Sequence, residues 1–114
     1  MRIREIAEVL HGSIICREDL ADREVISACG SDMMSDVLAY TKDQAVLITG
    51  LCNPQVVRTA EMIDVLCIVF VRNKMPDEET IELAKAKDIV MVRTPHRMFS
   101  ACGILYKEGL ISGN

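Results

Sequence analysis

Residues 65–71, Val-Leu-Cys-Ile-Val-Phe-Val, form the most apolar stretch of this chain and decide its fold. An unbroken apolar run of this length is typical of a strand buried on both faces, because a strand with one wet face alternates apolar and polar side chains. Helices must then cover both faces of the sheet that contains this strand. The run is far too short to cross a bilayer, which takes about 20 apolar residues.

Shorter apolar runs lie on both sides of this segment, and helical signals separate them. Further strands are expected at residues 13–16, 24–29, 45–49 and 89–92. Helices are expected at residues 3–10 and 33–41, after Asn53-Pro54, after Pro76, and from Thr94-Pro95 to Gly109. Strands that alternate with helices of about ten residues form βαβ units. We therefore predict an α/β fold, a single domain over residues 1–114 with a mostly parallel sheet of about five strands and helices on both faces.

Three turns in this pattern carry residues that favour the start of a helix. Gly30-Ser31-Asp32 is a turn that supplies an N-cap, and Asn53-Pro54 and Thr94-Pro95 each place a capping side chain before a proline. The spacing of the last helix predicts four inward side chains: Phe99, Cys102, Leu105 and Tyr106.

The composition excludes several classes of protein. Half of the 114 residues are apolar and 26% are charged, which excludes intrinsic disorder. A net charge of −4 disfavours a nucleic-acid partner, which normally meets a basic face. The first ten residues contain four charges and no apolar segment of a signal peptide, so we expect a cytoplasmic protein without membrane contact. The mean hydropathy of +0.22 leaves apolar surface for a partner, and we expect a homodimer.

The cysteines and histidines indicate neither a disulfide framework nor a metal site. There are five cysteines, an odd number, and no two are spaced as Cys-x-x-Cys. The two histidines, His11 and His96, form no ligand cluster with them along the sequence. We therefore expect free thiols, no bound metal and no cofactor.

Polar residues follow the predicted strands and define a candidate binding site. Ligands of parallel sheets bind beyond the carboxyl ends of the strands, where the helix starts also offer free N–H groups. Arg72, Lys74, Arg93 and His96 add positive charge at this edge, which suits a small anion such as an adenine nucleotide. Helix capping alone is the alternative explanation for several of these residues. The candidate ligand-binding residues are Ser31, Asp32, Thr49, Gly50, Asn53, Thr94 and His96.

Common catalytic motifs are absent. The chain contains no Gly-x-Gly-x-x-Gly, no phosphate-binding Gly-x-x-x-x-Gly-Lys-Ser/Thr and no Gly-x-Ser-x-Gly. No catalytic residue is therefore assigned, and we expect a protein that is not an enzyme. Two alternatives stay open: a small enzyme with a nucleophile–base pair of Cys52 and His96, and an adaptor that binds only proteins.

Three segments resemble a DRTGG domain: Leu20 to Val25 (LADREV), Ser31 to Leu38 (SDMMSDVL) and Phe99 to Leu110 (FSACGILYKEGL). The resemblance extends from about Ile3 to Leu110. This family is similar in fold to the amino-terminal domain of HPr kinase/phosphorylase. Its members occur beside CBS domains in regulatory proteins and pyrophosphatases, and as stand-alone proteins of anaerobes, some encoded near hydrogenase subunits. The resemblance implies a stand-alone regulatory or ligand-sensing module that acts on a partner, either a redox enzyme or a regulatory protein.

The chain departs from the family at two loops. Many members have Gly-Asp-Arg after the central strand, where this chain has Gly50-Leu51-Cys52-Asn53-Pro54-Gln55. They have Thr-Gly-Gly after the next strand, where this chain has Arg72-Asn73-Lys74. Ligand properties tied to those motifs therefore do not transfer, and the resemblance implies the fold and a non-catalytic role.

Overall fold

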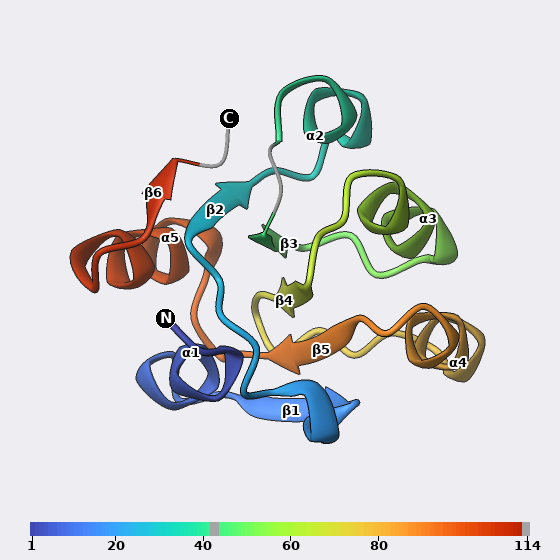
Figure 1. The fold of residues 1–114 in the computed structure, drawn as a ribbon, viewed down its shortest axis with the longest axis horizontal. Coiled ribbons are helices and arrows are strands. Elements are labelled where there is room, and N and C mark those ends of the chain that lie inside the picture. Colours follow the sequence, from blue (N-terminus) through green and yellow to red (C-terminus); the bar gives the residue numbers. More distant parts are fainter. Residues whose placement is uncertain (42–43, 113–114) are drawn as a thin grey trace.

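A single six-stranded sheet forms the centre of the protein in the computed structural model, which describes residues 1–41 and 44–112 (Figure 1). The strands lie in the order β1-β5-β4-β3-β2-β6, so the sheet has one strand more than the sequence predicts. Their bounds are β1 Ser13–Cys16, β2 Ser27–Gly30, β3 Ala45–Thr49, β4 Cys67–Phe70, β5 Val90–Arg93 and β6 Ile111–Ser112.

Parallel pairing dominates the sheet. The strands β2, β3, β4 and β5 pair in parallel with one another in this order, and β6 pairs in parallel with β2. Only β1 runs antiparallel, at the edge beside β5. The predicted α/β class with a mostly parallel sheet is confirmed. The additional strand is β6, whose two residues are too few to give a recognisable pattern in the sequence.

Helices cover both faces of the sheet, as predicted. The helices α1 and α5 pack on one face, and α2, α3 and α4 pack on the other (Figure 1). This arrangement follows from right-handed crossovers, because the chain moves along the sheet in one direction from β2 to β5 and returns through α5 to β6. The helix bounds are α1 Ile3–Val9, α2 Met34–Tyr40, α3 Pro54–Met62, α4 Glu78–Ala86 and α5 Met98–Lys107.

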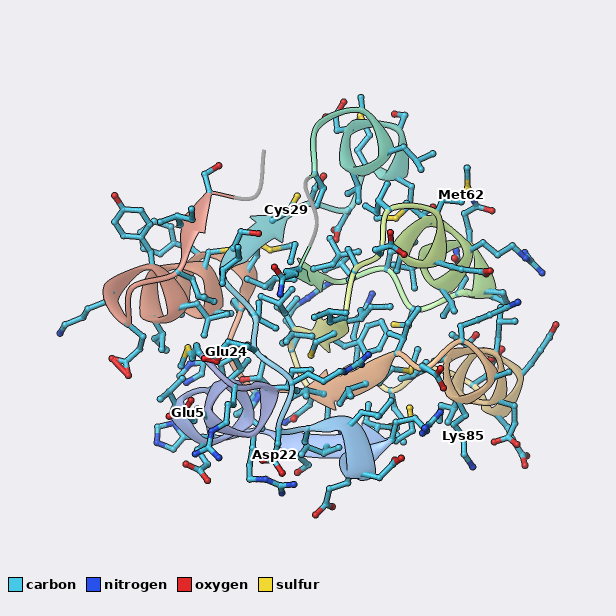
Figure 2. All side chains as sticks on the ribbon, viewed as in Figure 1. Glu5, Asp22, Glu24, Cys29, Met62 and Lys85 are labelled. Atoms are coloured by element: carbon cyan, nitrogen blue, oxygen red, sulfur yellow. The ribbon has the colours of Figure 1, made fainter. Side chains whose placement is uncertain are left out.

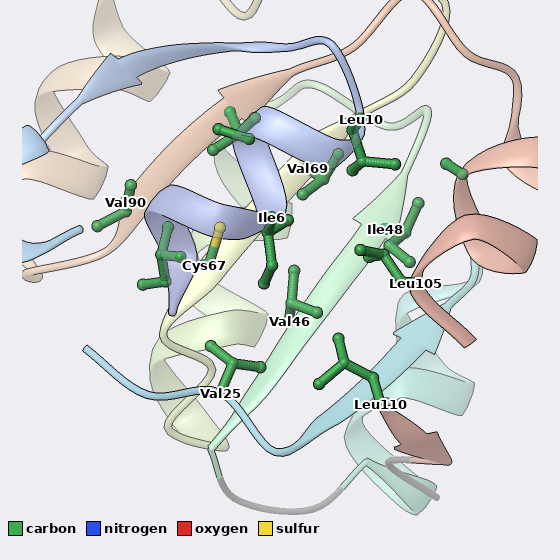
Figure 3. Packing of buried hydrophobic residues seen from close by; sticks show 14 of the residues in the cluster. Ile6, Leu10, Val25, Val46, Ile48, Cys67, Val69, Val90, Leu105 and Leu110 are labelled. Atoms are coloured by element: carbon green, nitrogen blue, oxygen red, sulfur yellow. The ribbon is translucent and has the colours of Figure 1, made fainter. Parts of the chain in front are cut away.

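The strand β4 lies in the interior of the sheet and is buried on both faces. Cys67 and Val69 belong to the core beneath α1 and α5, which Figure 3 shows, and Ile68 and Phe70 belong to the core on the opposite face. All four side chains are fully buried. The strand is shorter than residues 65–71, and strand β2 likewise begins at Ser27 rather than at residue 24.

Two of the three predicted helix caps are wrong. The Asn53 side chain accepts a hydrogen bond from the Gln55 N–H and caps α3, as predicted. Ser31 accepts from the Met33 N–H instead, in a turn that precedes α2 and its cap residue, Met33. Thr94 does not begin a helix either, because α5 starts at Met98.

The orientation predicted for two aromatic side chains of α5 is also wrong. Phe99 is 89% exposed and Tyr106 is 78% exposed, whereas Ala101 and Leu105 face the core. Apolar residues occur on every side of this helix, so their spacing alone does not reveal which side is buried. Cys102 is half-buried.

Ion pairs join α1 to the segment that precedes β2. The amino group of Met1 lies 3.1 Å from Glu24, and Arg4 lies 3.1 Å from Asp22. Glu5, Glu24 and Asp22 are labelled beside α1 and β1 in Figure 2. Because these carboxylates are mostly exposed, solvent screens the pairs and each contributes little to stability.

The five cysteines are all free. Within residues 1–41 and 44–112, no helix has the length and apolar content needed to cross a membrane. The same residues contain no group of three or more histidine, cysteine, aspartate or glutamate side chains placed to hold a metal ion.

Candidate functional site at the carboxyl edge of the sheet

Three loops meet where the central parallel strands end. Asp32 follows β2, Gly50 follows β3 and Arg72 follows β4 by two residues. These strands are neighbours in the sheet and run in parallel, so their carboxyl ends lie side by side. The sheet therefore brings together residues that are distant in sequence, as predicted for Asp32, Thr49 and Gly50.

Asp32 is bound to the end of β3 by two short hydrogen bonds. Its Oδ1 accepts from the Gly50 backbone N–H at 2.6 Å and from the Thr49 hydroxyl at 2.8 Å. Thr49 is fully buried, and its Oγ1 also accepts from the Leu51 N–H. Thr49 therefore orients the carboxylate and has no exposed surface with which to touch a ligand.

These contacts keep Asp32 ionised. The Gly50 N–H lowers the pKa of the Asp32 carboxyl below its ordinary value, and the Thr49 hydroxyl and the positive charges of Arg72 and Lys74 lower it further. Each of these groups interacts more strongly with the carboxylate than with the neutral acid. At neutral pH, Asp32 is therefore a fixed negative charge beside Gly50.

Two cations lie over the same loop. The Lys74 ammonium donates to the Gly50 carbonyl at 2.8 Å. The Arg72 guanidinium lies so close to Gly50 that its Nη2 would be 2.8 Å from an added Cβ. No hydrogen bond or ion pair of the Arg72 side chain is found among the described residues. Gly50 is itself buried, and the Arg72 guanidinium and the Asp32 carboxylate lie over it.

The Arg72 loop is held by its backbone. Arg72 and Asn73 both adopt the left-handed conformation, with φ of 58° and 54°. Their N–H groups donate to the His96 and Thr94 carbonyls at 2.8 and 2.7 Å. Two successive left-handed residues without glycine are unfavourable, and these two bonds hold the loop in that conformation.

Thr94 and His96 lie on the α1 side of this edge, where they contact other parts of the protein. The Thr94 hydroxyl is fully buried and donates to the Leu10 carbonyl at the end of α1, at 2.7 Å. It also accepts from the His96 N–H. The His96 ring lies beside His11, with ring centroids 5.8 Å apart, and its Nε2 has no hydrogen-bond partner among the described residues.

The remaining candidate residues do not complete a catalytic arrangement. Ser31 and Asn53 bond to nearby backbone N–H groups. The Cys52 thiol donates to the Gly50 carbonyl, and no hydrogen bond joins it to His96 in the described part of the chain. The nucleophile–base pair considered from the sequence is therefore not formed.

Arg72 and Lys74 lie closer to the centre of this candidate site than the sequence predicts. Both were expected to contribute charge at this edge, but neither was included among the ligand-binding residues. The available signal was the position of Arg72, one residue beyond the most apolar stretch of the chain.

A cavity of about 180 Å³ lies apart from these loops, between α5, β2 and β6. Its lining is mainly apolar and includes Ala28, Ile48 and Leu110. Gly30 forms part of its wall, where an added Cβ would meet the Cys102 sulfur at 2.6 Å. The charged groups described above do not line this cavity.

A mostly parallel sheet with helices on both faces defines an α/β domain of three layers. Residues 5–107 match the DRTGG domain, and the chain belongs to that family. No curated protein matches the sequence significantly.

Several solved chains match this fold. One of them contains the CBS and DRTGG domains of the regulatory region of Clostridium perfringens pyrophosphatase, complexed with the activator diadenosine tetraphosphate. The TM-score is 0.76 and the identity 18%; the likeness covers 96% of this chain and 48% of that chain. The present chain thus spans about half the length of that regulatory region. At this identity the likeness establishes the fold, and the resemblance to the DRTGG domain is confirmed.

Proposed function

We propose that this chain is a non-catalytic regulatory module that binds a nucleotide or another small anion at the carboxyl edge and acts through a partner protein. One observation carries the proposal. The exposed Arg72 guanidinium lies over Gly50, near Asp32, and has no ion-pair partner among the described residues. A guanidinium in this situation is suited to bind phosphate or carboxylate in two parallel hydrogen bonds.

The surroundings of Arg72 support the same function. Lys74 adds a second positive charge, and the hydrogen bonds of the loop backbone fix the position from which Arg72 extends. The regulatory region of the pyrophosphatase is complexed with an adenine dinucleotide, which makes adenine nucleotides the first ligands to test.

Thermal unfolding in the presence of nucleotides tests this function. ATP, AMP and diadenosine tetraphosphate are added separately, and a ligand present at 100 times its Kd stabilises the native state by about 2.7 kcal/mol. We expect at least one of them to raise the Tm of the wild-type protein. Arg72→Gln should abolish this shift and leave the Tm of the ligand-free protein unchanged.

Arg58→Gln is the matched control. Arg58 is an exposed arginine on α3 with no ion pair to another described residue, so its replacement removes the same charge from a different surface. This variant should keep the ligand-induced shift. A shift that survives in Arg72→Gln contradicts the proposed site, and the absence of any shift in the wild-type protein contradicts the proposed function.

Exposed apolar side chains support the second half of the proposal, action through a partner. Phe99 and Tyr106 on α5 are the most exposed large apolar side chains among the described residues. Aromatic side chains are enriched where partners bind, which also favours the adaptor as a second candidate function. We expect a homodimer, and light scattering at micromolar concentration tests it. A species of 12.7 kDa alone would contradict the dimer.

A further inference from the structure

The second oxygen of Asp32 and the guanidinium of Arg72 both lie near Gly50 at the exposed carboxyl edge. Its Oδ1 accepts both hydrogen bonds from the end of β3, whereas its Oδ2 accepts none from the described residues. Oδ2 would lie 3.5 Å from an added Cβ on Gly50, and Arg72 Nη2 would lie 2.8 Å from the same point. No ion pair joins the two side chains. A ligand that binds Arg72 at this edge therefore also meets an ionised carboxylate.

This pair of groups selects the chemistry of the ligand. An ionised carboxylate only accepts hydrogen bonds, so a bare polyphosphate would place its own oxygens against Oδ2 and be repelled. A ligand that fits both groups carries an anion for Arg72 and a hydrogen-bond donor for Asp32. A ribonucleotide has both, because its ribose hydroxyls lie near its phosphates. An acidic residue binds ribose in the same way in dinucleotide-binding sheets.

We propose that the ligand of this site is a ribonucleotide, with a phosphate on Arg72 and a ribose hydroxyl that donates to Asp32 Oδ2. This inference rests on the proposed function, because it specifies the ligand class of the same site. It assigns the two side chains different tasks: Arg72 supplies affinity for the anion, and Asp32 discriminates nucleotides from other anions of similar charge.

Three probes with the same triphosphate group test the inference: ATP, 2′,3′-dideoxy-ATP and tripolyphosphate. Binding is measured by titration calorimetry on the wild-type protein. We expect dideoxy-ATP and tripolyphosphate to bind at least roughly tenfold more weakly than ATP, the effect of losing one hydrogen bond to a charged group.

Asp32→Asn sharpens the comparison between the probes. Asparagine retains an acceptor for the Gly50 N–H and the Thr49 hydroxyl, and it replaces the second oxygen by an amide that donates. The preference for ATP over dideoxy-ATP should disappear, and tripolyphosphate should bind more tightly than it does to the wild-type protein. Asp36→Asn is the control, because Asp36 is an exposed aspartate on α2, and this variant should behave as the wild type.

The outcomes separate this inference from the proposed function. If the wild-type protein binds all three probes equally and Arg72→Gln weakens them all, the site is an anion site and the ribose contact is wrong. Binding of none of the three by the wild-type protein overturns both proposals. Equal discrimination in Asp32→Asn and the wild type shows that another group recognises the sugar and overturns the role of Asp32. If Asp32→Asn does not fold, the binding of the three probes to the wild-type protein still tests whether the site recognises the ribose.

Discussion

An arginine lies at each end of the central strands, and the two differ in what their guanidinium groups contact. At the amino ends of β4 and β5, Arg23 Nη2 donates to the Leu66 carbonyl at 3.0 Å and to the Asp88 carbonyl at 2.7 Å. At the carboxyl ends, no hydrogen bond or ion pair of the Arg72 side chain is found among the described residues. One arginine connects segments of the fold, and the other is exposed to solvent.

This difference separates charge that stabilises the fold from charge that is available to a ligand. Burial lowers the pKa of Arg23, so its placement has a desolvation cost that the two carbonyls offset. A cleft of about 150 Å³ lies beside it, but the nearby Lys87 is paired with Glu61 at 3.4 Å. At the carboxyl edge, Arg72 has neither a hydrogen bond nor an ion pair among the described residues, and we therefore propose the site there.

The largest effect is expected from a change in the strand that connects the two edges. Val69→Asp puts an unpaired charge at a fully buried position of β4, which costs several kcal/mol against a total stability of about 5–15 kcal/mol. We expect no folded, soluble protein, as measured by soluble yield and circular dichroism. Met62→Asp is the control, because Met62 is 71% exposed, and it should fold. A folded Val69→Asp protein would contradict the position of β4.

Replacing each arginine by methionine tests the comparison directly. Arg23→Met removes the donor to two carbonyls and should lower the free energy of unfolding by about 1–3 kcal/mol. Arg72→Met removes no hydrogen bond found in the described structure and should change it by less than about 0.5 kcal/mol. Urea denaturation of both variants measures the difference. Equal decreases in the free energy of unfolding would mean that the two guanidinium groups contribute equally to the stability of the folded protein, which would contradict this comparison.

The pH dependence of stability sharpens the assignment of Asp32. The folded state lowers the pKa of this carboxyl below 3.8, so its contribution to stability is fully present above the unfolded value. The contribution is lost as the pH falls from that value through the lower folded pKa. The difference in unfolding free energy between the wild type and Asp32→Asn should therefore be constant from pH 5 to 8 and shrink below about pH 4. A difference that does not change with pH would show that Asp32 is not held as a carboxylate.

Much of the fold was predictable because burial leaves a local signal. The apolar runs around Val69 and at residues 45–49 indicate buried parallel strands without any knowledge of their neighbours. The cap assigned to Thr94 failed for the opposite reason. Its hydroxyl bonds to Leu10, 84 residues away, and no local pattern reveals such a contact. Phe99 was misplaced because α5 is apolar on more than one side.

The sequence predicts only the part of the candidate site that follows from the positions of the strand ends. Asp32 and Gly50 follow neighbouring strands, so topology alone brings them together. Whether Arg72 is paired depends on how far a long side chain reaches and on which carboxylates surround it. That is a property of the assembled loops, and it decides which of the polar residues at this edge are available to a ligand.

The smallest effect on stability is expected at Gly50. An added Cβ would lie 2.8 Å from Arg72 Nη2, at the end of a flexible side chain that can move outward, and 3.5 Å from Asp32 Oδ2. Because Gly50 has no positive φ, alanine is not strained there, and reduced freedom of the unfolded chain offsets the contact by about 0.4–1 kcal/mol. Gly50→Ala should therefore have nearly the wild-type Tm and a strongly reduced shift with ATP, because the methyl group displaces the Arg72 guanidinium from its position near Asp32. Gly103→Ala is the control, since an added Cβ at Gly103 meets nothing within 4 Å, and its ATP shift should equal that of the wild type. If Gly50→Ala retains the full shift, ligand binding does not depend on the position of Arg72 near Asp32.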